Sequence, residues 1–242
     1  MFKNYLKTAL RNMRRQKGYS LLNVLGLAMG MACAILIVFY IHHELSYDRF
    51  HADADRVFRV AMEGAFGGEP IHMAVTPDPL AQALVSRYPE VAAATRIRKM
   101  GPTSVKYADR EFMESGIVWA DPALFEVFTF PPVRGDVRTA LAGSGDVVLT
   151  ERAAAKYFGT EDPLGKVIRF GGRYDYAVTG VIRDIPQESH LQFDLICSLA
   201  TIYPGSSGLR EDWINTISGY TYLRLNSPDA AKPLEGKLIG LM

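Results

Sequence analysis

The sequence predicts an α+β protein in which one N-terminal transmembrane helix is followed by a mixed α/β domain. Three observations lead to this fold class. No charged side chain lies between Gly18 and Ile41. Six basic residues precede that run, and no acidic residue occurs before Glu44. After residue 45, segments with the two-residue alternation of strands are interspersed with short segments that have helix start and stop signals.

The apolar run has the length of a membrane span. Its core, from Leu21 to Ile41, has 21 residues, and Asn23 is its only strongly polar side chain. As a helix it would be about 31 Å long, close to the roughly 30 Å of a bilayer's hydrocarbon core. A cleavable signal peptide has a shorter apolar part, of about 7 to 15 residues. The lipoprotein-like "GMAC" is followed by further apolar residues. We therefore expect a transmembrane helix over residues 19–44.

Residues 1–18 predict a basic amphipathic helix in the cytoplasm. Apolar side chains recur on one helical face, and the other face is basic. The basic residues at the membrane surface are Lys3, Lys7, Arg11, Arg14, Arg15 and Lys17. By the positive-inside rule they place the N-terminus in the cytoplasm and the bulk of the chain outside. They also predict contact with membrane lipid, either as a simple basic flank or as a helix lying along the surface. Gly18 is a candidate for the bend between the two helices.

Small residues mark one face of the membrane helix. Gly26, Gly30 and Ala34 follow one another at intervals of four. This spacing lets the backbone of a second helix approach closely, although glycine and alanine are also common in membrane helices generally. Ala28 and Ala32 add a second row, so we expect a helix partner, which would make the protein a homodimer or a heterodimer.

Residues 45–242 predict the mixed α/β domain, and its first elements can be read from local signals. The alternation of Phe58, Val60 and Met62 with polar neighbours predicts a half-buried strand. Thr76 followed by Pro77 predicts a helix N-terminus, with threonine as the cap and proline in the first turn.

Later elements carry equally local signals. Thr150 is the expected N-cap of a helix over "ERAAAKYF", which Gly159 would end. Gly171 and Gly172 predict a hairpin between "KVIRF" and "YDYAVTGVIRDI", whose second strand would have Tyr174, Tyr176, Val178 and Ile182 on one face. "GYTYLRLN" predicts a late strand, and Ser227–Pro228 predict a final helix with Leu234, Leu238 and Leu241 along one face.

The stretch "IVFYIHHELSYDRFH", residues 37–51, permits two interpretations. On one continuous helix Glu44, Asp48 and His51 would share a face, as in a metal site. The preferred interpretation is a joint between the membrane helix and the outer domain, formed by Glu44, Leu45, Tyr47 and Asp48. If the helix continues to about Tyr47, it would pass movement of the span into the strand that begins near Val57.

No catalytic, cofactor-binding or metal-ligating residue is predicted. "GTEDPLGKV" has five residues between its glycines and lacks the Lys-Ser/Thr pair of a phosphate-binding loop. The two cysteines, Cys33 and Cys197, do not suggest a disulfide framework. Residues 44–242 carry a net charge of −5, with 21 basic and 26 acidic residues, so a nucleic-acid partner is not expected.

Ordered motifs give the sequence a family resemblance. The start contains "K-x-x-L-R-N-x-x-R", "N-x-x-G-L-A-x-G-M-A" and "E-L-S-Y-D-x-F-H". Further on are "DPALFEVFTFPPVRGD", "VVLTERAAAKYFG", "DPLGKVIRF" and "YAVTGVIRDIPQESHLQFD". In these segments, which cover nearly the whole chain, the sequence resembles permeases of the MacB/FtsX type of ABC transporter.

The resemblance implies a two-lobed periplasmic core domain and a location in the bacterial inner membrane. It also implies a partner ATPase, whose ATP hydrolysis drives periplasmic movement for export or mechanotransmission, with no catalysis by the permease itself. Such permeases have further membrane helices after the periplasmic domain, so we expect this sequence to be an N-terminal portion that is incomplete at its C-terminus.

Two other functions remain open at this point. A stand-alone, membrane-anchored periplasmic sensor or binding module would also need a single span. A membrane-tethered hydrolase would draw on the many carboxylates and on the proposed face of Glu44, Asp48 and His51.

Overall fold

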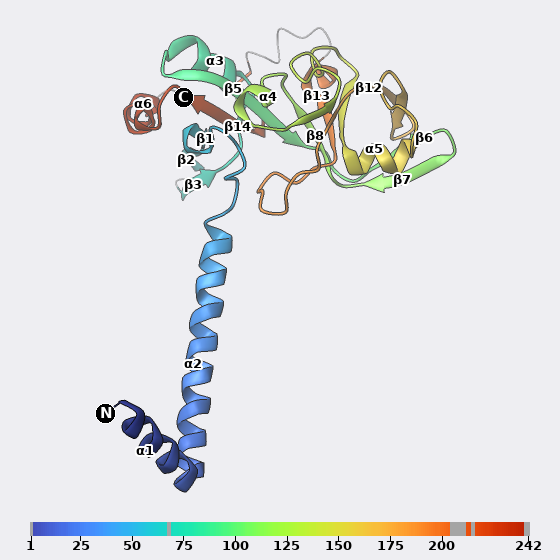
Figure 1. Cartoon of the computed structure of the whole chain (residues 1–242). Helices are drawn as coiled ribbons and strands as arrows, with labels where there is room; N and C mark the ends of the chain where they lie inside the picture. The colour runs from blue at the N-terminus through green and yellow to red at the C-terminus, as the bar shows by residue number, and fades with distance from the viewer. Residues whose placement is uncertain (1, 67–68, 204–211, 214–215, 240–242) are drawn as a thin grey trace. The chain divides into compact units, whose positions relative to one another are not determined.

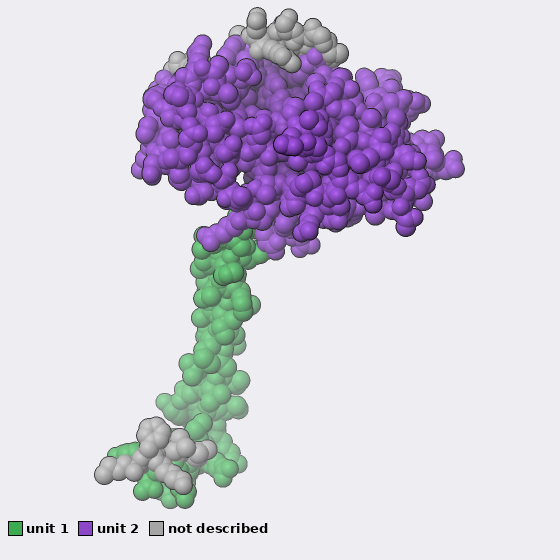
Figure 2. All heavy atoms as spheres, turned by 45° about the horizontal axis from the view of Figure 1, so that its top comes forward, with its two compact units in different colours: residues 1–47 green, residues 48–242 purple. Residues whose placement is uncertain are grey.

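The protein consists of two compact units, residues 1–47 and 48–242 (Figure 2). The computed structural model describes residues 2–66, 69–203, 212–213 and 216–239. The two units are treated separately below.

The first unit contains two helices, α1 (Phe2–Arg15) and α2 (Lys17–Glu44) (Figure 1). The helical geometry breaks at Gln16, whose φ of −113° and ψ of 60° lie outside the helical region. The predicted bend at Gly18 is therefore wrong: Gly18 lies within the first turn of α2, where the helix tolerates it. Helix α2 has 28 residues, an 18-residue stretch of it has a mean hydropathy of 2.5, and none of its residues is buried. By length and composition it is able to cross a membrane.

The second unit is built on one large mixed sheet (Figure 1). Its strands follow the order β1-β14-β5-β8-β13-β10-β12-β11-β6-β7, with β4 paired to β14 and β9 paired to β12. Strands β2 (Met62–Phe66) and β3 (Glu69–Met73) form a separate antiparallel hairpin. The large sheet comprises β1 (Val57–Arg59), β4 (Thr76–Pro77), β5 (Val91–Lys99), β6 (Thr103–Tyr107), β7 (Arg110–Glu114), β8 (Ile117–Ala120), β9 (Pro132–Arg134), β10 (Asp146–Thr150), β11 (Val167–Phe170), β12 (Tyr174–Ile182), β13 (Leu195–Ser198) and β14 (Ile217–Leu225).

The central strands are buried on both faces, so their sequences are almost entirely apolar. On β10, Val147 and Leu149 belong to one cluster of buried side chains, while Val148 between them belongs to another. Helix α5 (Glu151–Phe158) covers the first face, and α4 (Leu124–Val127) with the segment up to Leu141 covers the second. The sheet therefore lies between two hydrophobic cores.

A third cluster lies at the β14 end of the sheet. Leu80 and Leu84 of α3 (Pro79–Arg87) meet Leu234 of α6 (Ala231–Leu238) over Leu223 of β14. In the described residues, three short 3₁₀ helices connect the larger elements: η1 (Ala54–Arg56), η2 (Leu199–Ile202) and η4 (Pro228–Ala230). The predicted position of Leu241 on the final helix lies outside the described residues. The predicted fold, an apolar helix followed by a mixed α/β domain, is confirmed, and one large mixed sheet forms the centre of that domain.

Several local predictions are confirmed by the geometry. The Thr150 hydroxyl accepts a hydrogen bond from the Ala153 amide at 3.2 Å and caps α5, which ends at Gly159 with a φ of 64°. Gly171 and Gly172 have φ of 57° and 69°. Two successive positive φ values are those of a type I′ hairpin turn, which few residues other than glycine adopt without strain.

Two local predictions are wrong. Thr76 and Pro77 form the short strand β4, and the hydroxyl of Thr76 bonds to Thr221 at 2.7 Å, so the cap of α3 is Asp78. Ile182 does not share a face with Tyr176 and Val178, because the pairing of β12 with β10 shifts by one residue after Val178. One extra residue reverses which side chains face each side of a sheet.

Candidate functional site

The face with small residues lies on α2, which is exposed along its length. A Cβ atom added at Gly26 or Gly30 would meet nothing within 4 Å. Ala34 lies one turn further along the same helix and is also exposed. Among the described residues of this unit, the face predicted for helix packing is therefore open.

The basic residues lie on α1 and at the start of α2. Lys7, Arg11, Arg14 and Arg15 are exposed on α1, and Lys17 is the first residue of α2. Lys3 belongs to α1, but its side chain lies outside the described part of the chain. Together they form one basic segment that directly precedes the apolar helix.

The predicted joint begins where α2 ends, at Glu44. Residues 45–50 form turns, with Leu45 as the C-cap, so the helix does not continue to Tyr47. Leu45 and Tyr47 are both exposed, and the Tyr47 ring packs edge-on against His43 at 5.5 Å. Because the helix ends before Asp48 and His51, these two residues share no helical face with Glu44. In the described residues no group of three histidine, cysteine, aspartate or glutamate side chains is placed to hold a metal.

Asp48 begins the outer domain and is held by the segment between β12 and β13. Its backbone amide donates to the Glu188 carbonyl at 2.8 Å. Its carboxylate accepts hydrogen bonds from the Ser189 hydroxyl at 2.9 Å and the His190 amide at 3.1 Å, and lies 2.7 Å from Nδ1 of the His190 ring. Asp48 also has a φ of 59°, a left-handed conformation that aspartate adopts more readily than most residues. We call Asp48, Ser189, His190 and Tyr222 the Asp48 network.

Tyr222 completes this network from strand β14. Its hydroxyl lies 2.9 Å from Nε2 of His190, so both ring nitrogens of that histidine have a partner. Tyr222 is buried, and burial raises the pKa of its hydroxyl above the usual 10. The network thus ties the first residue of the domain to the sheet through a single imidazole ring.

The electrostatics of Asp48 favour its charged form. Burial acts to raise the pKa of Asp48, but the hydrogen bond and charge of His190 and the bond from Ser189 outweigh it, so the pKa lies below its ordinary 3.8. A carboxylate that accepts several hydrogen bonds is stabilised in the ionised state. Asp48 is therefore an anion under all ordinary conditions.

His51 lies one turn further on and is almost completely buried, at 4% exposure. Its Nδ1 accepts a hydrogen bond from the Thr129 amide at 3.0 Å, and the Thr129 hydroxyl accepts one from the Ala52 amide at 2.9 Å. The ring lies among Phe50, Phe128 and Phe130, at centroid distances of 3.9, 5.0 and 5.5 Å; the first two rings are tilted against it and Phe130 is edge-on. Residues 48–52 are thus fastened to the domain by two separate sets of contacts.

The arrangement of the Asp48 network does not activate a nucleophile. Nucleophilic catalysis needs the hydroxyl to face a base, which is in turn oriented by an acid. Here the Ser189 hydroxyl donates to the aspartate itself, and Ser189 is 3% exposed. The contacts hold backbone segments together and present no reactive oxygen to a substrate.

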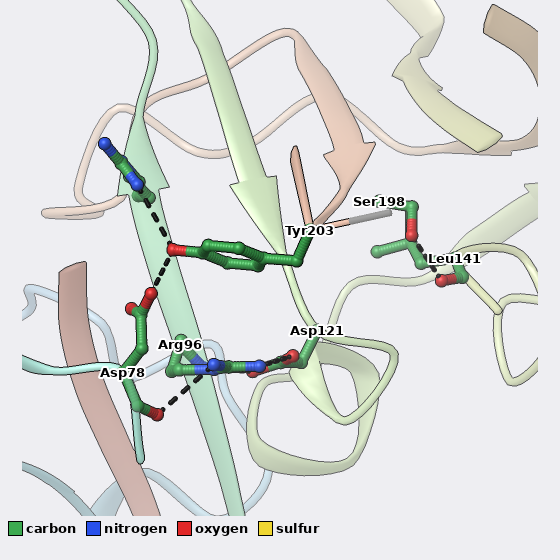
Figure 3. A network of polar contacts seen from close by, with 7 residues as sticks. Asp78, Arg96, Asp121, Leu141, Ser198 and Tyr203 are labelled. Carbon is green, nitrogen blue, oxygen red and sulfur yellow. Dashed lines mark hydrogen bonds and ion pairs between the residues drawn. The ribbon is translucent and has the colours of Figure 1, made fainter. Parts of the chain in front are cut away.

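A second polar network lies deeper in the domain (Figure 3). Arg96 on β5 forms two parallel bonds with Asp121, at 2.8 and 2.7 Å, and also donates to the Asp78 carbonyl at 3.2 Å. The Tyr203 hydroxyl donates to the Asp78 carboxylate and accepts from Arg98 at 3.2 Å. We call these five residues the Arg96 network, which joins the start of α3 to β5, α4 and the end of η2.

Sequence reasoning identified Asp48 but missed Ser189, His190, Tyr222 and Thr129. Asp48 and Ser189 are 141 residues apart, and no local pattern links them. The available signal was that "ELSYDRFH" and "QESHLQFD" both belong to segments on which the family resemblance rests. The fold brings these two segments into direct contact.

Comparisons with known proteins agree with this fold. The chain is 29% identical over 179 residues to the macrolide export ATP-binding/permease protein MacB of Syntrophobacter fumaroxidans, and it spans 25% of that relative's length. A domain of a permease protein from Porphyromonas gingivalis has a TM-score of 0.68 at 23% identity, covering 78% of this chain and 81% of that one.

The periplasmic region of MacB from Actinobacillus actinomycetemcomitans is similar with a TM-score of 0.55 at 20% identity, over 77% of this chain and 84% of that chain. The extracellular domain of the ABC-type transporter YknZ from Gram-positive bacteria has a TM-score of 0.53 at 15% identity, with coverages of 73% and 86%. Residues 20–241 match the family described as the MacB-like periplasmic core domain. The chain belongs to that family.

Proposed function

We propose that this chain is part of the permease subunit of an ABC transporter and that it carries movement between the membrane and the periplasm. The observation that supports this most is the Asp48 network, in which the first residue of the outer domain makes four contacts with residues 188–190. A displacement of the chain at residue 47 would be passed through these contacts to β13 and β14.

The proposal includes the orientation and the partners predicted from the sequence. The N-terminus is cytoplasmic, α2 crosses the inner membrane, and residues 45–242 are periplasmic, as the basic residues before α2 favour. A partner ATPase supplies the energy, and α1 contacts membrane lipid through its basic side chains. The chain itself performs no catalysis and binds no cofactor or nucleic acid.

Association with an ATPase is the direct test. The full-length permease should co-purify with an ATPase subunit in mild detergent, and ATP hydrolysis should change the hydrogen exchange of the periplasmic domain. A permease that never retains an ATPase, in detergent or in nanodiscs, would contradict the proposal and favour a stand-alone periplasmic binding module.

The small-residue face of α2 is proposed as the surface that packs against a second permease helix. Replacing Gly30 with leucine places a large side chain where a partner backbone would approach, so association should fall several-fold in a membrane energy-transfer assay. Met29 is 71% exposed and serves as the matched control, because Met29→Leu keeps the volume nearly constant. Equal association of the two variants would contradict a role for this face.

A further inference from the structure

We propose that His51 is a proton-sensitive element that loosens the attachment of residues 48–52 to the outer domain when the periplasm becomes acidic. This inference deepens the proposed function, because it adds regulation to the same attachment. It rests on how the imidazole ring is held.

The hydrogen bonds of His51 require a neutral ring. The Thr129 amide is a donor, so Nδ1 must carry a lone pair and the proton must be on Nε2. Nε2 is itself buried and has no hydrogen-bond partner in the described residues. Protonation at Nδ1 would place two N–H groups against each other and would leave a cation among aromatic rings.

The surroundings add little that would stabilise the charged ring. The facing segment contributes Phe128, Thr129 and Phe130, which carry no charge. Asp48, from the turn before His51, attracts a proton, whereas His190, from the segment after β12, opposes it when protonated. Arg59 acts to lower the pKa of the Tyr222 hydroxyl, which lies at the far end of the Asp48 network.

The direction of the pH effect follows from these contacts. Burial is the main cause that lowers the pKa of His51 below its ordinary 6.5. A histidine whose pKa is lowered by folding binds a proton more readily in the open state, so acid favours opening. The contribution of His51 to the attachment of residues 48–52 is therefore complete above about pH 6.5 and is lost progressively as the pH falls below that value. Asp48 stays ionised in this range, since its own pKa lies below 3.8.

The experiment measures hydrogen exchange of the Thr129 amide, which reports directly on its bond to His51. In the whole chain in nanodiscs, the protection factor, corrected for intrinsic exchange, should fall by about tenfold from pH 7.5 to pH 5.5. That is the limit set by an ordinary pKa of about 6.5 in the open state. His51→Asn keeps an acceptor for the Thr129 amide but cannot titrate, so its protection should not change with pH.

Three results would overturn the inference. They are a pH-independent protection factor in the wild type, an unchanged pH dependence in His51→Asn, and the loss of that dependence in His190→Gln. If His51→Asn does not fold, the titration of the His51 ring signals in the wild type decides. A midpoint near pH 6.5 is that of an unconstrained histidine and would also overturn the inference. No ATPase is needed for these measurements, so their failure would leave the proposed coupling function standing.

Discussion

The Asp48 network and the Arg96 network both hold distant segments of the outer domain together, but the side chain that contacts the aspartate differs between them. Each uses an aspartate and a tyrosine hydroxyl to join segments that are distant in sequence. In the Arg96 network the cation is a guanidinium, which is always charged and matches a carboxylate with two parallel bonds. In the Asp48 network the partner is the imidazole of His190, which contacts the aspartate through one ring nitrogen and Tyr222 through the other.

The difference indicates two roles for buried polar contacts in one domain. The Arg96 network joins α3, β5 and α4 within the domain, where a constant interaction maintains the fold. The Asp48 network lies at residue 48, where the outer domain begins. Its contacts therefore hold the point at which the chain enters the outer domain.

We expect the largest effect on the free energy of unfolding from the replacement of Arg96. Arg96→Ala removes both guanidinium bonds to Asp121, which is 20% exposed, and leaves its carboxylate only the backbone amide of residue 96 at 3.0 Å; this should lower the free energy of unfolding by about 3 kcal/mol. Denaturation of the chain in detergent can be followed by tryptophan fluorescence, because both tryptophans, Trp119 and Trp213, lie in the outer domain. The matched control is Arg138→Ala: the Arg138 side chain is 83% exposed beside Asp136, so its removal should change stability little. If both variants lost the same amount of stability, the Arg96–Asp121 pair would contribute no more than an exposed surface pair, which would contradict the proposed role of the Arg96 network.

A smaller loss is expected at Asp48. Asp48→Ala removes the acceptor for Ser189 and His190, and should cost about 2 kcal/mol in the same fluorescence experiment. Asp48→Gly should cost less than the alanine variant, because glycine adopts the φ of 59° without strain. The control is Asp55→Ala at an exposed position, which should change stability little. An Asp48→Ala protein as stable as the wild type would contradict the anchoring role of Asp48.

The tyrosine of the Asp48 network should contribute less than the aspartate. Tyr222→Phe leaves Nε2 of His190 without its partner at a partly exposed position, and about 1 kcal/mol should be lost. Tyr174→Phe, at a side chain that is 62% exposed, is the matched control and should have almost no effect. If neither substitution changes stability, the Tyr222 hydroxyl does not contribute to the Asp48 network.

The smallest expected effect is the acid dependence carried by Asp48 itself. Its pKa is lowered in the folded state, so its contribution to stability is complete above about pH 3.8 and is lost as the pH falls further. Asp48→Asn should flatten the acid limb of the stability curve measured between pH 5 and pH 3. An identical limb in the variant would mean that other carboxylates account for it.

The sequence predicted elements whose causes are local. The cap at Thr150, the glycine turn at 171–172 and the apolar span depend on neighbouring residues, so they could be read directly. The prediction at Thr76 failed because its hydroxyl bonds to Thr221 on a distant strand, which outweighs the local capping signal. The face of Ile182 was missed because the extra residue in β12 shows itself only in the pairing with β10.

In the candidate site, too, only features with a local cause could be predicted from the sequence. Helix α2 ends at Glu44, with Leu45 as its C-cap, where charge and hydropathy change along the sequence; the role of these residues as a joint stays a prediction. The residues that hold Asp48 come from the segment after β12 and from β14, and no periodic pattern links them to residue 48. The family resemblance named both segments but not their contact.

The most direct test of the central claim compares hydrogen exchange of residues 183–193 in the full-length permease with its ATPase, with and without ATP. Two forms are needed: the wild type, and a variant with Leu45–Tyr47 replaced by Gly-Ser-Gly, which keeps Asp48 and its contacts. We expect ATP to change exchange in this segment in the wild type and to have no effect in the variant. An equal response to ATP in both forms would contradict transmission of movement through residues 45–48.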